Sequence, residues 1–456
     1  MFFESFWLNC TVAIGLIAAL TFDYVTKFFS YWYVRHVPYK ISVPFYGGDY
    51  HRILGLRSNT QEINALYKSY KEDFVGSVKS RIPDLTVKSP DIVKEVLSTN
   101  FKNFKSRGLD LDKSRDVCLR NNLFYAEGEK WTLLRHGLVS ILEDFKISED
   151  DSLECLSGTN GDVNVQELLA QVLDIVFKNL LLKDVDENII TDLRKSVQER
   201  TLRDRFKSYL KSIFPSVYTL FGLSTLIGQP TNKIRKTLQN AQLSKKLSLV
   251  FKLDEKENIK KLKTQPDDLS FGVLSSFITE GYIPILNVLT ALFYELAKNP
   301  EAQKRARISS EHLDAAIKET LRLHPPYSVI TRKCVKTYKF LDSKMLIDKG
   351  VTVNVPIEAL HRDNIYFKEA GDFKPERFLD SSVHGYTFLP FGAGPRKCIG
   401  EELSLQIIRT VASSLLKKFD VYIAMGKTPS QLALVDYNFT RVIDDDVWLR
   451  FKPIEC

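Results

Sequence analysis

A single cysteine in a glycine- and proline-rich segment is the feature of this chain best suited to chemistry. The segment reads Phe391-Gly392-Ala393-Gly394-Pro395-Arg396-Lys397-Cys398-Ile399-Gly400. Residues 401–416 after it have helical periodicity, so Cys398 lies just before a helix N-terminus, where a thiolate is stabilised. Glycines let a flat ligand approach the backbone closely, and Arg396 is placed to pair with a carboxylate of that ligand. The alternative is a glycine loop around an inert, buried cysteine.

Two other pairs of residues have helical spacing. Glu319 and Arg322 are three residues apart, and Trp131 and Arg135 are four apart, so each pair shares one helix face. Taken alone, such pairs are more often solvated surface contacts than parts of a site.

The cysteine segment resembles that of the cytochrome P-450 haem-thiolate monooxygenases, which reads F-G-x-G-x-R-x-C-x-G. All six specified positions are met, by Phe391, Gly392, Gly394, Arg396, Cys398 and Gly400. The resemblance implies that haem b binds here, with Cys398 as the ligand of the iron.

The same resemblance implies roles for the arginines. In Pro375-Glu376-Arg377-Phe378, Arg377 would complete a buried triad with Glu319 and Arg322 on the proximal side of the haem. Arg135 and Arg332 would each bind a haem propionate.

Trp131 would lie beside the haem as well. The stretches 121–131 and 359–363 resemble the animal microsomal branch, particularly its arthropod members. The resemblance extends from the N-terminal segment to about residue 451.

The helix expected over the haem departs from the family pattern small-Gly-x-acid-Thr-Thr. This chain reads Glu280-Gly281-Tyr282-Ile283-Pro284-Ile285, so Ile283 replaces the acid and Pro284 the alcohol. Gly281 fits the pattern, and Pro284 predicts a kink. The replaced groups normally deliver protons for oxygen activation. Either Glu280 or Thr279 substitutes for them through water, or oxygen activation is impaired.

Composition narrows the class of protein. The 456 residues are 44% hydrophobic and 26% charged, which argues against disorder and against a coiled-coil rod. The net charge is +8, and basic and acidic residues are mixed along the chain, with no basic arm that would bind a nucleic acid. The six cysteines form no CxxC pair and the histidines have no metal-ligand spacing, which argues against a zinc module and a disulfide framework.

Hydrophobic periodicity predicts a mainly α protein with a small β region. The resemblance implies that this is the cytochrome P-450 fold. Helices are expected at 128–142, 164–183, 189–212, 269–297, 311–323 and 401–418, and strands at 80–87 and near 338–354. The apolar stretch 269–296 carries Glu280, Asn287 and Glu295. It is therefore expected to be a buried central helix and not a second membrane span.

The N-terminus predicts a membrane anchor. Residues 5–22 carry no charge, and Lys27, Arg35 and Lys40 follow them, which places the rest of the chain on the cytosolic side. The aromatic residues that follow are expected to form an interfacial belt: Phe28, Phe29, Tyr31, Trp32 and Tyr33. An extended connector is expected around Val37-Pro38-Tyr39 and Val43-Pro44. The predicted organisation is an anchor and interfacial segment, 1–35, and a haem-thiolate catalytic domain, 36–456.

Together with the predicted anchor, the resemblance implies a monooxygenase of the endoplasmic reticulum membrane with a cytosolic catalytic domain and a single N-terminal anchor. It would take electrons from an NADPH-cytochrome reductase, contact membrane lipid and insert one oxygen atom of O2 into a small lipophilic substrate. The mild positive charge suits an acidic reductase surface. Two alternatives remain open: a haem-thiolate isomerase or dehydratase of peroxides, which needs no proton relay, and a catalytically degenerate haem-binding member. The missing distal alcohol favours the first alternative. Ile283, Pro284 and short segments around 248–268 and 303–311 favour the second.

Overall fold

The structure is a computed structural model of the whole chain. It describes residues 6–40, 58–79, 82–109, 111, 114–145, 147, 161–182, 189–198, 202–213, 215–224, 232–253, 255–341, 343, 345–379, 385–437 and 440–454. In the connector expected around residues 37–39 and 43–44, Tyr39 pairs with Gly76 as an isolated β-bridge, and Val43-Pro44 lies outside the described residues.

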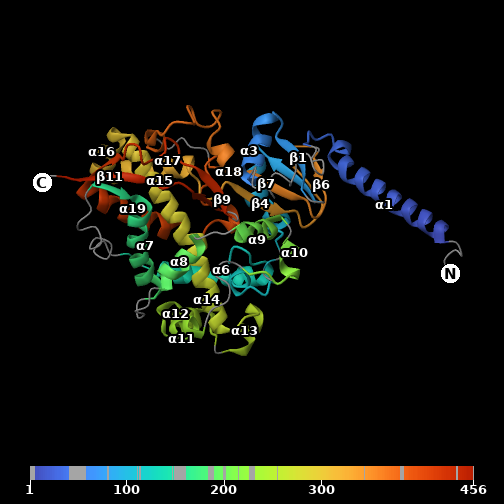
Figure 1. Cartoon of the computed structure of the whole chain (residues 1–456), viewed down its shortest axis with the longest axis horizontal. Helices are drawn as coiled ribbons and strands as arrows, with labels where there is room; N and C mark the ends of the chain where they lie inside the picture. Colours follow the sequence, from blue (N-terminus) through green and yellow to red (C-terminus); the bar gives the residue numbers. More distant parts are fainter. Residues whose placement is uncertain are drawn as a thin grey trace.

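Helices make up most of the molecule (Figure 1). The α-helices are α1 (Phe6–Val34), α3 (Asn59–Ser69), α4 (Pro90–Lys94), α5 (Val117–Arg120), α6 (Gly128–Glu143), α7 (Val165–Leu181), α8 (Ile189–Gln198), α9 (Leu202–Ile213), α10 (Pro215–Leu220), α11 (Asn232–Asn240), α12 (Gln242–Phe251), α13 (Lys256–Leu262), α14 (Pro266–Ser276), α15 (Ile283–Lys298), α16 (Pro300–Ile308), α17 (Ser310–Leu323), α18 (Ile357–His361) and α19 (Glu401–Lys418). Short 3-10 or π turns are η1 (Glu95–Thr99), η2 (Phe101–Asn103), η6 (Phe277–Tyr282), η7 (Pro375–Phe378) and η8 (Gly394–Arg396).

In the described part of the chain, the strands form four small sheets. The largest has the order β1-β2-β7-β4, from β1 (Phe74–Lys79), β2 (Ile82–Val87), β7 (Thr352–Pro356) and β4 (Val329–Lys333). Only the β2–β7 pair in it is parallel. The second sheet is β3 (Gly161–Asn164), β11 (Trp448–Pro453) and β8 (Phe419–Ile423), and two hairpins pair β9 (Leu434–Tyr437) with β10 (Thr440–Ile443) and β5 (Tyr338–Lys339) with β6 (Leu346–Ile347). The predicted mainly α fold with a small β region is confirmed.

Most predicted elements appear within a few residues of their expected bounds. The pattern over 189–212 is an exception, because it forms two helices, α8 and α9, with residues 199–201 between them outside the described residues. The four-stranded sheet is larger than predicted, because β7 joins β2 and β4 from distant parts of the sequence. Such non-local pairing leaves no periodic signal in either segment.

The central helix is long, apolar and buried. Among the described residues, one helical stretch, Pro266–Lys298, is long and apolar enough to cross a membrane, and 72% of its most apolar window is buried. Leu289, Leu292 and Phe293 on it are fully buried against neighbouring helices such as α7 and α19. The expectation of a buried core helix is therefore confirmed.

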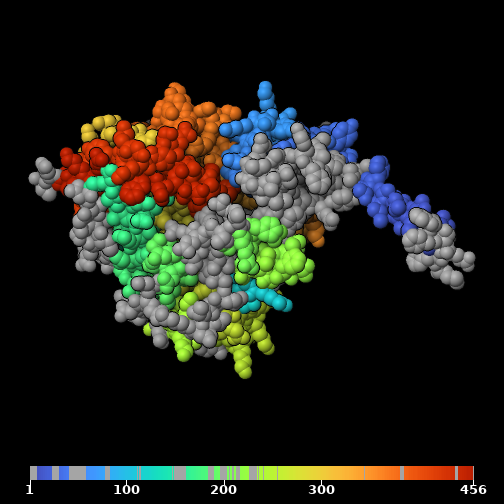
Figure 2. Space-filling view, in the orientation of Figure 1, coloured from blue at the N-terminus to red at the C-terminus, as the bar shows by residue number. Residues whose placement is uncertain are grey.

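Helix α1 projects from the body as a rod, with the N-terminus at its far end (Figures 1 and 2). Its apolar side chains point outward: Ile14, Leu20 and Phe22 are 67%, 68% and 72% exposed. The apolar part of α1, Leu8–Phe22, is shorter than the apolar stretch of the central helix, which is long enough to cross a membrane.

The C-terminal end of α1 is fixed to the large sheet. Trp32 is fully buried, and its indole N–H donates to the Ser77 carbonyl at 2.8 Å. Gly76 makes this contact possible, because a Cβ at that position would lie 2.6 Å from the indole ring. The expectation that Trp32 belongs to an interfacial belt is therefore wrong; the missing side chain at Gly76 creates the site into which its ring packs.

We expect Trp32→Ala to lower the free energy of unfolding by about 3–5 kcal/mol, because it empties a fully packed site. Thermal unfolding of the full chain measures this. Tyr33→Ala is the control, since Tyr33 is 70% exposed and its loss should change stability by less than about 0.5 kcal/mol. Equal, small shifts for both variants would contradict a packed junction.

Candidate active site

The cysteine segment folds into a tight loop ahead of α19. Gly392 and Gly394 have φ of +73° and +70°, a backbone region that favours glycine. At Gly394 a Cβ would come within 1.9 Å of the Leu97 carbonyl oxygen, so the loop packs directly on the η1 backbone. The Cys398 N–H donates to the Phe391 carbonyl at 2.9 Å and closes the loop.

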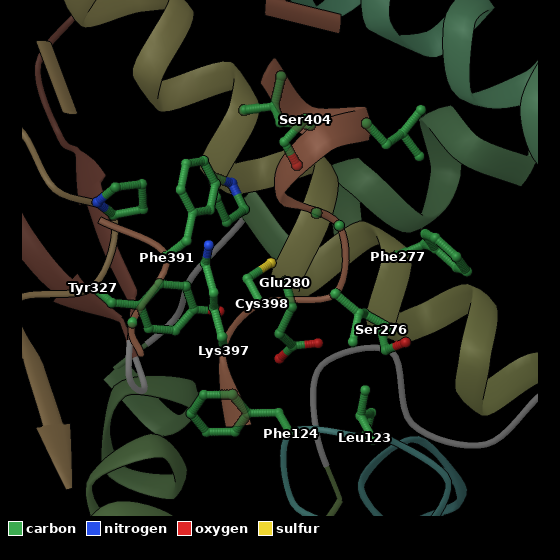
Figure 3. Close-up of a pocket in the computed structure, with 18 of the residues that line it drawn as sticks. Leu123, Phe124, Ser276, Phe277, Glu280, Tyr327, Phe391, Lys397, Cys398 and Ser404 are labelled. Atoms are coloured by element: carbon green, nitrogen blue, oxygen red, sulfur yellow. The ribbon is translucent and has the colours of Figure 1, made fainter. Parts of the chain in front are cut away.

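The thiol of Cys398 faces a cavity inside the molecule (Figure 3). Burial raises the pKa of this thiol above its ordinary value, and a hydrogen bond from the Gly400 amide opposes the rise. Gly400 also begins α19 as its N-cap residue, so the helix N-terminus predicted next to the sulfur is present. A helix N-terminus and an amide donor both favour the thiolate form.

Four arginines line the same cavity: Arg107, Arg135, Arg332 and Arg396. Arg135 donates to the Lys397 carbonyl at 2.8 Å. Arg396 donates to the carbonyls of Lys105 and Ala126 and to Glu127, and its guanidinium lies over the Trp131 ring, 4.7 Å from the centroid.

Two of these arginines keep an unsatisfied donor. The Nε atoms of Arg107 and Arg332 are buried without a hydrogen-bond partner in the described part of the chain. Burial lowers the pKa of Arg107 to about 10 and that of Arg332 well below its ordinary value, and the arginines depress one another further. Because buried positive charge without a partner is costly, this wall is suited to an anionic ligand.

These residues fit a haem. A thiol supplies an axial ligand, glycines allow close approach of a flat ring, and the unsatisfied donors of Arg107 and Arg332 match carboxylates such as haem propionates. Phe391, Gly392 and Gly400 line the cavity as the resemblance implies.

The opposite wall is the central helix, which contains a π-helical turn, η6, immediately before α15. Pro284, near the start of α15, has no N–H to donate to the Glu280 carbonyl, and its ring crowds the preceding turn. A wider π turn accommodates such a break. The π turn directly precedes the position at which the sequence predicts a kink.

Glu280, Gly281 and Pro284 line the cavity from this helix, whereas Ile283 is buried in the core. The Glu280 carboxyl accepts from Asn122 Nδ2 at 2.7 Å and from Thr279 Oγ1 at 2.5 Å. Thr279 Oγ1 also lies 3.0 Å from the Ser275 carbonyl, so its single proton is shared between its own helix and Glu280.

Burial raises the pKa of Glu280 to about 7. The hydrogen bonds from Thr279 and Asn122 and the charges of Lys211 and Arg107 oppose the rise. A carboxyl with a pKa near 7 is half protonated under ordinary conditions, which suits a group that transfers protons.

Glu319, Arg322 and Arg377 meet behind the cysteine loop. Arg322 holds both oxygens of Glu319 at 2.8 Å, and Arg377 Nε donates to Glu319 Oε1 at 3.0 Å. Both members of the Glu319–Arg322 pair are fully buried. The remaining Arg322 donors reach the carbonyls of His361, Ala370 and Asp372.

His361 connects this triad to the cysteine loop. Its Nδ1 lies 3.2 Å from the Arg322 carbonyl, and its Nε2 accepts from the Leu389 amide at 2.8 Å. Burial lowers the pKa of His361 to about 3, so the ring stays neutral and its proton lies on Nδ1.

Sequence reasoning missed Arg107, Glu127 and Tyr327. The one sequence feature that could have drawn attention to Arg107 is the glycine beside it. Gly108 has a φ of +74°, and a Cβ at that position would clash with Lys333. Glu127 accepts from the Arg107 amide at 2.8 Å and from Arg396 at 3.0 Å, a pairing of distant segments that no local pattern indicates.

Comparisons with known proteins agree with this arrangement. A sequence model described as Cytochrome P450 matches residues 182–434, more than half of the chain. "Probable cytochrome P450 6d5" of Drosophila melanogaster is 28% identical, over 90% of this chain and 94% of its own length. "Cytochrome P450 6l1" of Blattella germanica is 24% identical over 94% of each chain, and "Cytochrome P450 6B1" of Papilio polyxenes is 26% identical over 90% and 92%.

A mainly helical fold with a cysteine loop facing clustered arginines defines a protein of the haem-thiolate class. The chain belongs to the cytochrome P450 family. Members of this family are typically monooxygenases with a haem-thiolate cofactor, and the named relatives are insect proteins, as the arthropod-like motifs predicted.

Proposed function

We propose that this chain is a haem-thiolate monooxygenase that inserts one oxygen atom of O2 into a lipophilic organic substrate, with electrons from an NADPH-dependent reductase. One observation carries the proposal: the Cys398 thiol faces a cavity whose opposite wall presents the Glu280 carboxyl. Membership of the cytochrome P450 family supports it.

Haem b, when bound, supplies redox and oxygen chemistry, and a thiolate ligand favours O–O cleavage. Cys398 would ligate the iron, with the Gly400 amide stabilising its negative charge. Arg107, Arg332 and Arg135 would hold the propionates, to which the first two bring unsatisfied donors.

Arg396 would contribute charge to the propionate site while it remains anchored by Glu127. Glu319, Arg322 and Arg377 would keep the proximal side rigid, and they contact neither the thiol nor the cavity.

Glu280 would hold the proton that the family's acid-alcohol pair normally supplies. It occupies the same helix face as Pro284, one turn earlier, and therefore reaches the cavity that Ile283 does not. Asn122 and Thr279 fix the carboxyl through its Oε2 atom. Water in the cavity would connect the carboxyl to the reacting centre, and the remaining wall is mainly apolar, so Glu280 is the acidic side chain among the lining residues.

Glu280→Gln is expected to lower kcat by about 100-fold, because an amide keeps the shape but cannot release a proton. A larger share of the electrons taken from NADPH should then appear as hydrogen peroxide. The donor is the protonated form and its pKa is about 7, so the wild-type rate should fall as the pH rises through 7. Product formation and peroxide release measured from pH 6 to 9 test both points.

Glu295→Gln is the matched control. Glu295 lies on the same helix and contacts His324 Nε2 at 2.8 Å, outside the cavity, so its variant should keep the wild-type pH profile. A Glu280→Gln enzyme with the wild-type rate and pH profile would contradict the role of Glu280.

We also propose that α1 anchors the protein in the endoplasmic reticulum membrane, with the catalytic domain, 36–456, in the cytosol. The exposed apolar side chains of α1 support this, because a projecting apolar helix is unfavourable in water. Arg35 and Lys40 follow the helix on the side expected to be cytosolic.

The test of the whole function is spectroscopic and enzymatic. The reduced full-length protein with carbon monoxide should show the strongly red-shifted Soret band of a haem-thiolate site. Oxygen uptake should then require NADPH together with a cytochrome reductase. A protein that takes up no haem would contradict the proposal.

A haem-thiolate isomerase or dehydratase of peroxides is the second candidate, and Pro284 favours it because no distal hydroxyl occupies that position. Turnover of a lipid hydroperoxide without NADPH would identify that activity. Tight ligand binding without product under either condition would indicate a degenerate member.

A further inference from the structure

The central helix lacks one of its own backbone bonds at the turn that carries Glu280. Pro284 has no N–H for the Glu280 carbonyl, and the Ile283 amide donates five residues back, to the Ile278 carbonyl, as in a π turn. The Glu280 side chain is held at one carboxyl oxygen, Oε2, while Oε1 makes no hydrogen bond within the described part of the chain. A turn of this kind depends on contacts from outside the helix to keep its shape.

Tyr282 supplies such contacts. It lies two positions after Glu280, on roughly the opposite face of the helix, and its side chain is fully buried outside the cavity. Its hydroxyl lies 2.7 Å from Asp174 Oδ1 and 2.8 Å from the Ala170 carbonyl, so its single proton is shared between two acceptors of α7. The Tyr282 ring also packs edge-on against Phe177 of α7, with centroids 5.1 Å apart. The break in the central helix is therefore tied to α7 by both ring and hydroxyl.

Asp174, the charged acceptor, is itself held in place by α8. Arg194 donates to both of its oxygens, from Nε to Oδ1 and from Nη2 to Oδ2, each at 3.2 Å. Thr191 Oγ1 donates to Oδ2 at 2.8 Å. The side chains of Arg194 and Asp174 are both largely buried. Because an arginine that holds both carboxylate oxygens fixes their orientation, the Tyr282 hydroxyl has a rigid partner.

The Tyr282 phenol keeps its proton at physiological pH. Burial raises the pKa of Tyr282 well above its ordinary value, and the charge of Asp174 raises it further, although Arg194 opposes the rise. The contact with α7 therefore stays the same while Glu280, whose pKa burial raises to about 7, gains or loses its proton.

We propose that Tyr282 is a positioning residue, which anchors the broken turn of the central helix to α7 and so keeps the Glu280 carboxyl directed into the cavity. The anchor replaces, from outside the helix, the backbone bond that Pro284 removes. This inference rests on the proposed role of Glu280, and it adds the residue that holds Glu280 in place.

The test is the titration of Glu280 in the haem-loaded full chain, followed by infrared difference spectroscopy between about pH 5 and 9. The carboxyl signal that Glu280→Gln removes identifies Glu280, and its midpoint in the wild type is expected at about pH 7. Tyr282→Phe removes the anchoring hydroxyl, keeps the ring beside Phe177 and leaves Asp174 paired with α8. The midpoint should then fall by about one pH unit, because a released turn admits water to the carboxyl and reduces the effect of burial.

Tyr294→Phe is the matched control. Tyr294 lies on the same helix, and its hydroxyl is 2.6 Å from the Ser430 carbonyl, away from the break and outside the cavity. This variant loses a comparable hydrogen bond and should keep the wild-type midpoint. An unchanged midpoint in Tyr282→Phe, or an equal fall in Tyr294→Phe, would overturn the inference.

The other groups that act on the titration of Glu280 are the same in both variants. The hydrogen bonds from Asn122 and Thr279 and the charges of Lys211 and Arg107 lower its pKa, and the neutral phenol of Tyr327 is also coupled to it. Since neither substitution changes any of these side chains, a difference between the two variants reports the position of the Glu280 turn.

Hydrogen exchange of the wild type is a second measurement, which needs no variant. The amides of η6 should be protected as strongly as those in the middle of α15, despite the backbone bond that Pro284 removes. Rapid exchange confined to η6 would overturn the inference. Neither measurement involves turnover, so a chain that forms no product with NADPH and reductase would contradict the proposed function and leave the test of the anchor intact.

Discussion

Cys398→Ser is expected to abolish the red-shifted Soret band of the reduced carbon monoxide complex and to lower monooxygenase turnover at least about 100-fold. Serine occupies nearly the same volume in the loop, so the Gly392 and Gly394 turns and the amide of Gly400 remain in place. What changes is the ligand. The serine hydroxyl stays protonated where a cysteine thiol ionises, so it cannot replace the electron-rich thiolate that favours O–O cleavage.

The matched control is Cys334→Ser. Cys334 is fully buried outside the cavity, and its thiol donates to the Lys336 carbonyl at 2.7 Å, a contact that a serine hydroxyl can also make. This variant should keep the red-shifted band and the turnover. A red-shifted band that persists in Cys398→Ser would mean that another group ligates the iron.

The red-shifted band can be lost because the protein contains no haem or because the haem has lost its thiolate ligand. Haem content, measured as total iron, distinguishes these two causes. Retained haem with an altered spectrum assigns the effect to the ligand itself. Retention is expected, because Arg107, Arg332 and Arg396 face the propionate side independently of the sulfur.

The cysteine loop could be read from the sequence because its constraints are local. Gly392 and Gly394 adopt positive φ, and the Cys398 amide closes a turn within eight residues. The spacing of Glu319 and Arg322 fixes a shared helix face in the same way. Local geometry of this kind leaves its signature in consecutive residues.

The polar groups around Glu280 could not be read in this way, because they meet through tertiary structure. Asn122 reaches Glu280 across 158 positions of sequence, and Tyr327 approaches the same cavity from the start of β4. The Tyr327 ring stacks on Phe124, again from a distant segment, and no local pattern indicates this contact.

The burial of Trp32 was mispredicted for a related reason. An aromatic cluster after an apolar helix is typical of a membrane interface, and nothing near Trp32 in sequence indicates otherwise. The site into which it packs is created by Gly76 on β1, more than forty residues away. Amphipathic aromatic residues serve both environments, so their position is decided by the available partner.

Glu319→Ala is expected to remove most of the folded, haem-containing protein. The carboxylate is fully buried and accepts hydrogen bonds from Arg322, Arg377 and the Lys374 amide. Its loss leaves the Arg322 charge buried without its counter-ion, a change that costs about 3–5 kcal/mol where one partner of a buried pair is removed. That is a large part of the about 5–15 kcal/mol by which proteins are stable.

Arg377→Ala should be milder, because Arg377 is 14% exposed and its loss leaves Glu319 paired with Arg322. Glu301→Ala is the control for removing a glutamate: its pair with Lys304 is 75% and 64% exposed and should be worth less than about 0.5 kcal/mol. The loss of thermal stability and of the red-shifted band should therefore be smallest for Glu301→Ala, larger for Arg377→Ala and largest for Glu319→Ala. A Glu319→Ala protein as stable as Glu301→Ala would show that the triad does not hold the proximal side together. His361 carries the effect to the haem side, because its ring joins the Arg322 carbonyl to the Leu389 amide just ahead of the cysteine loop.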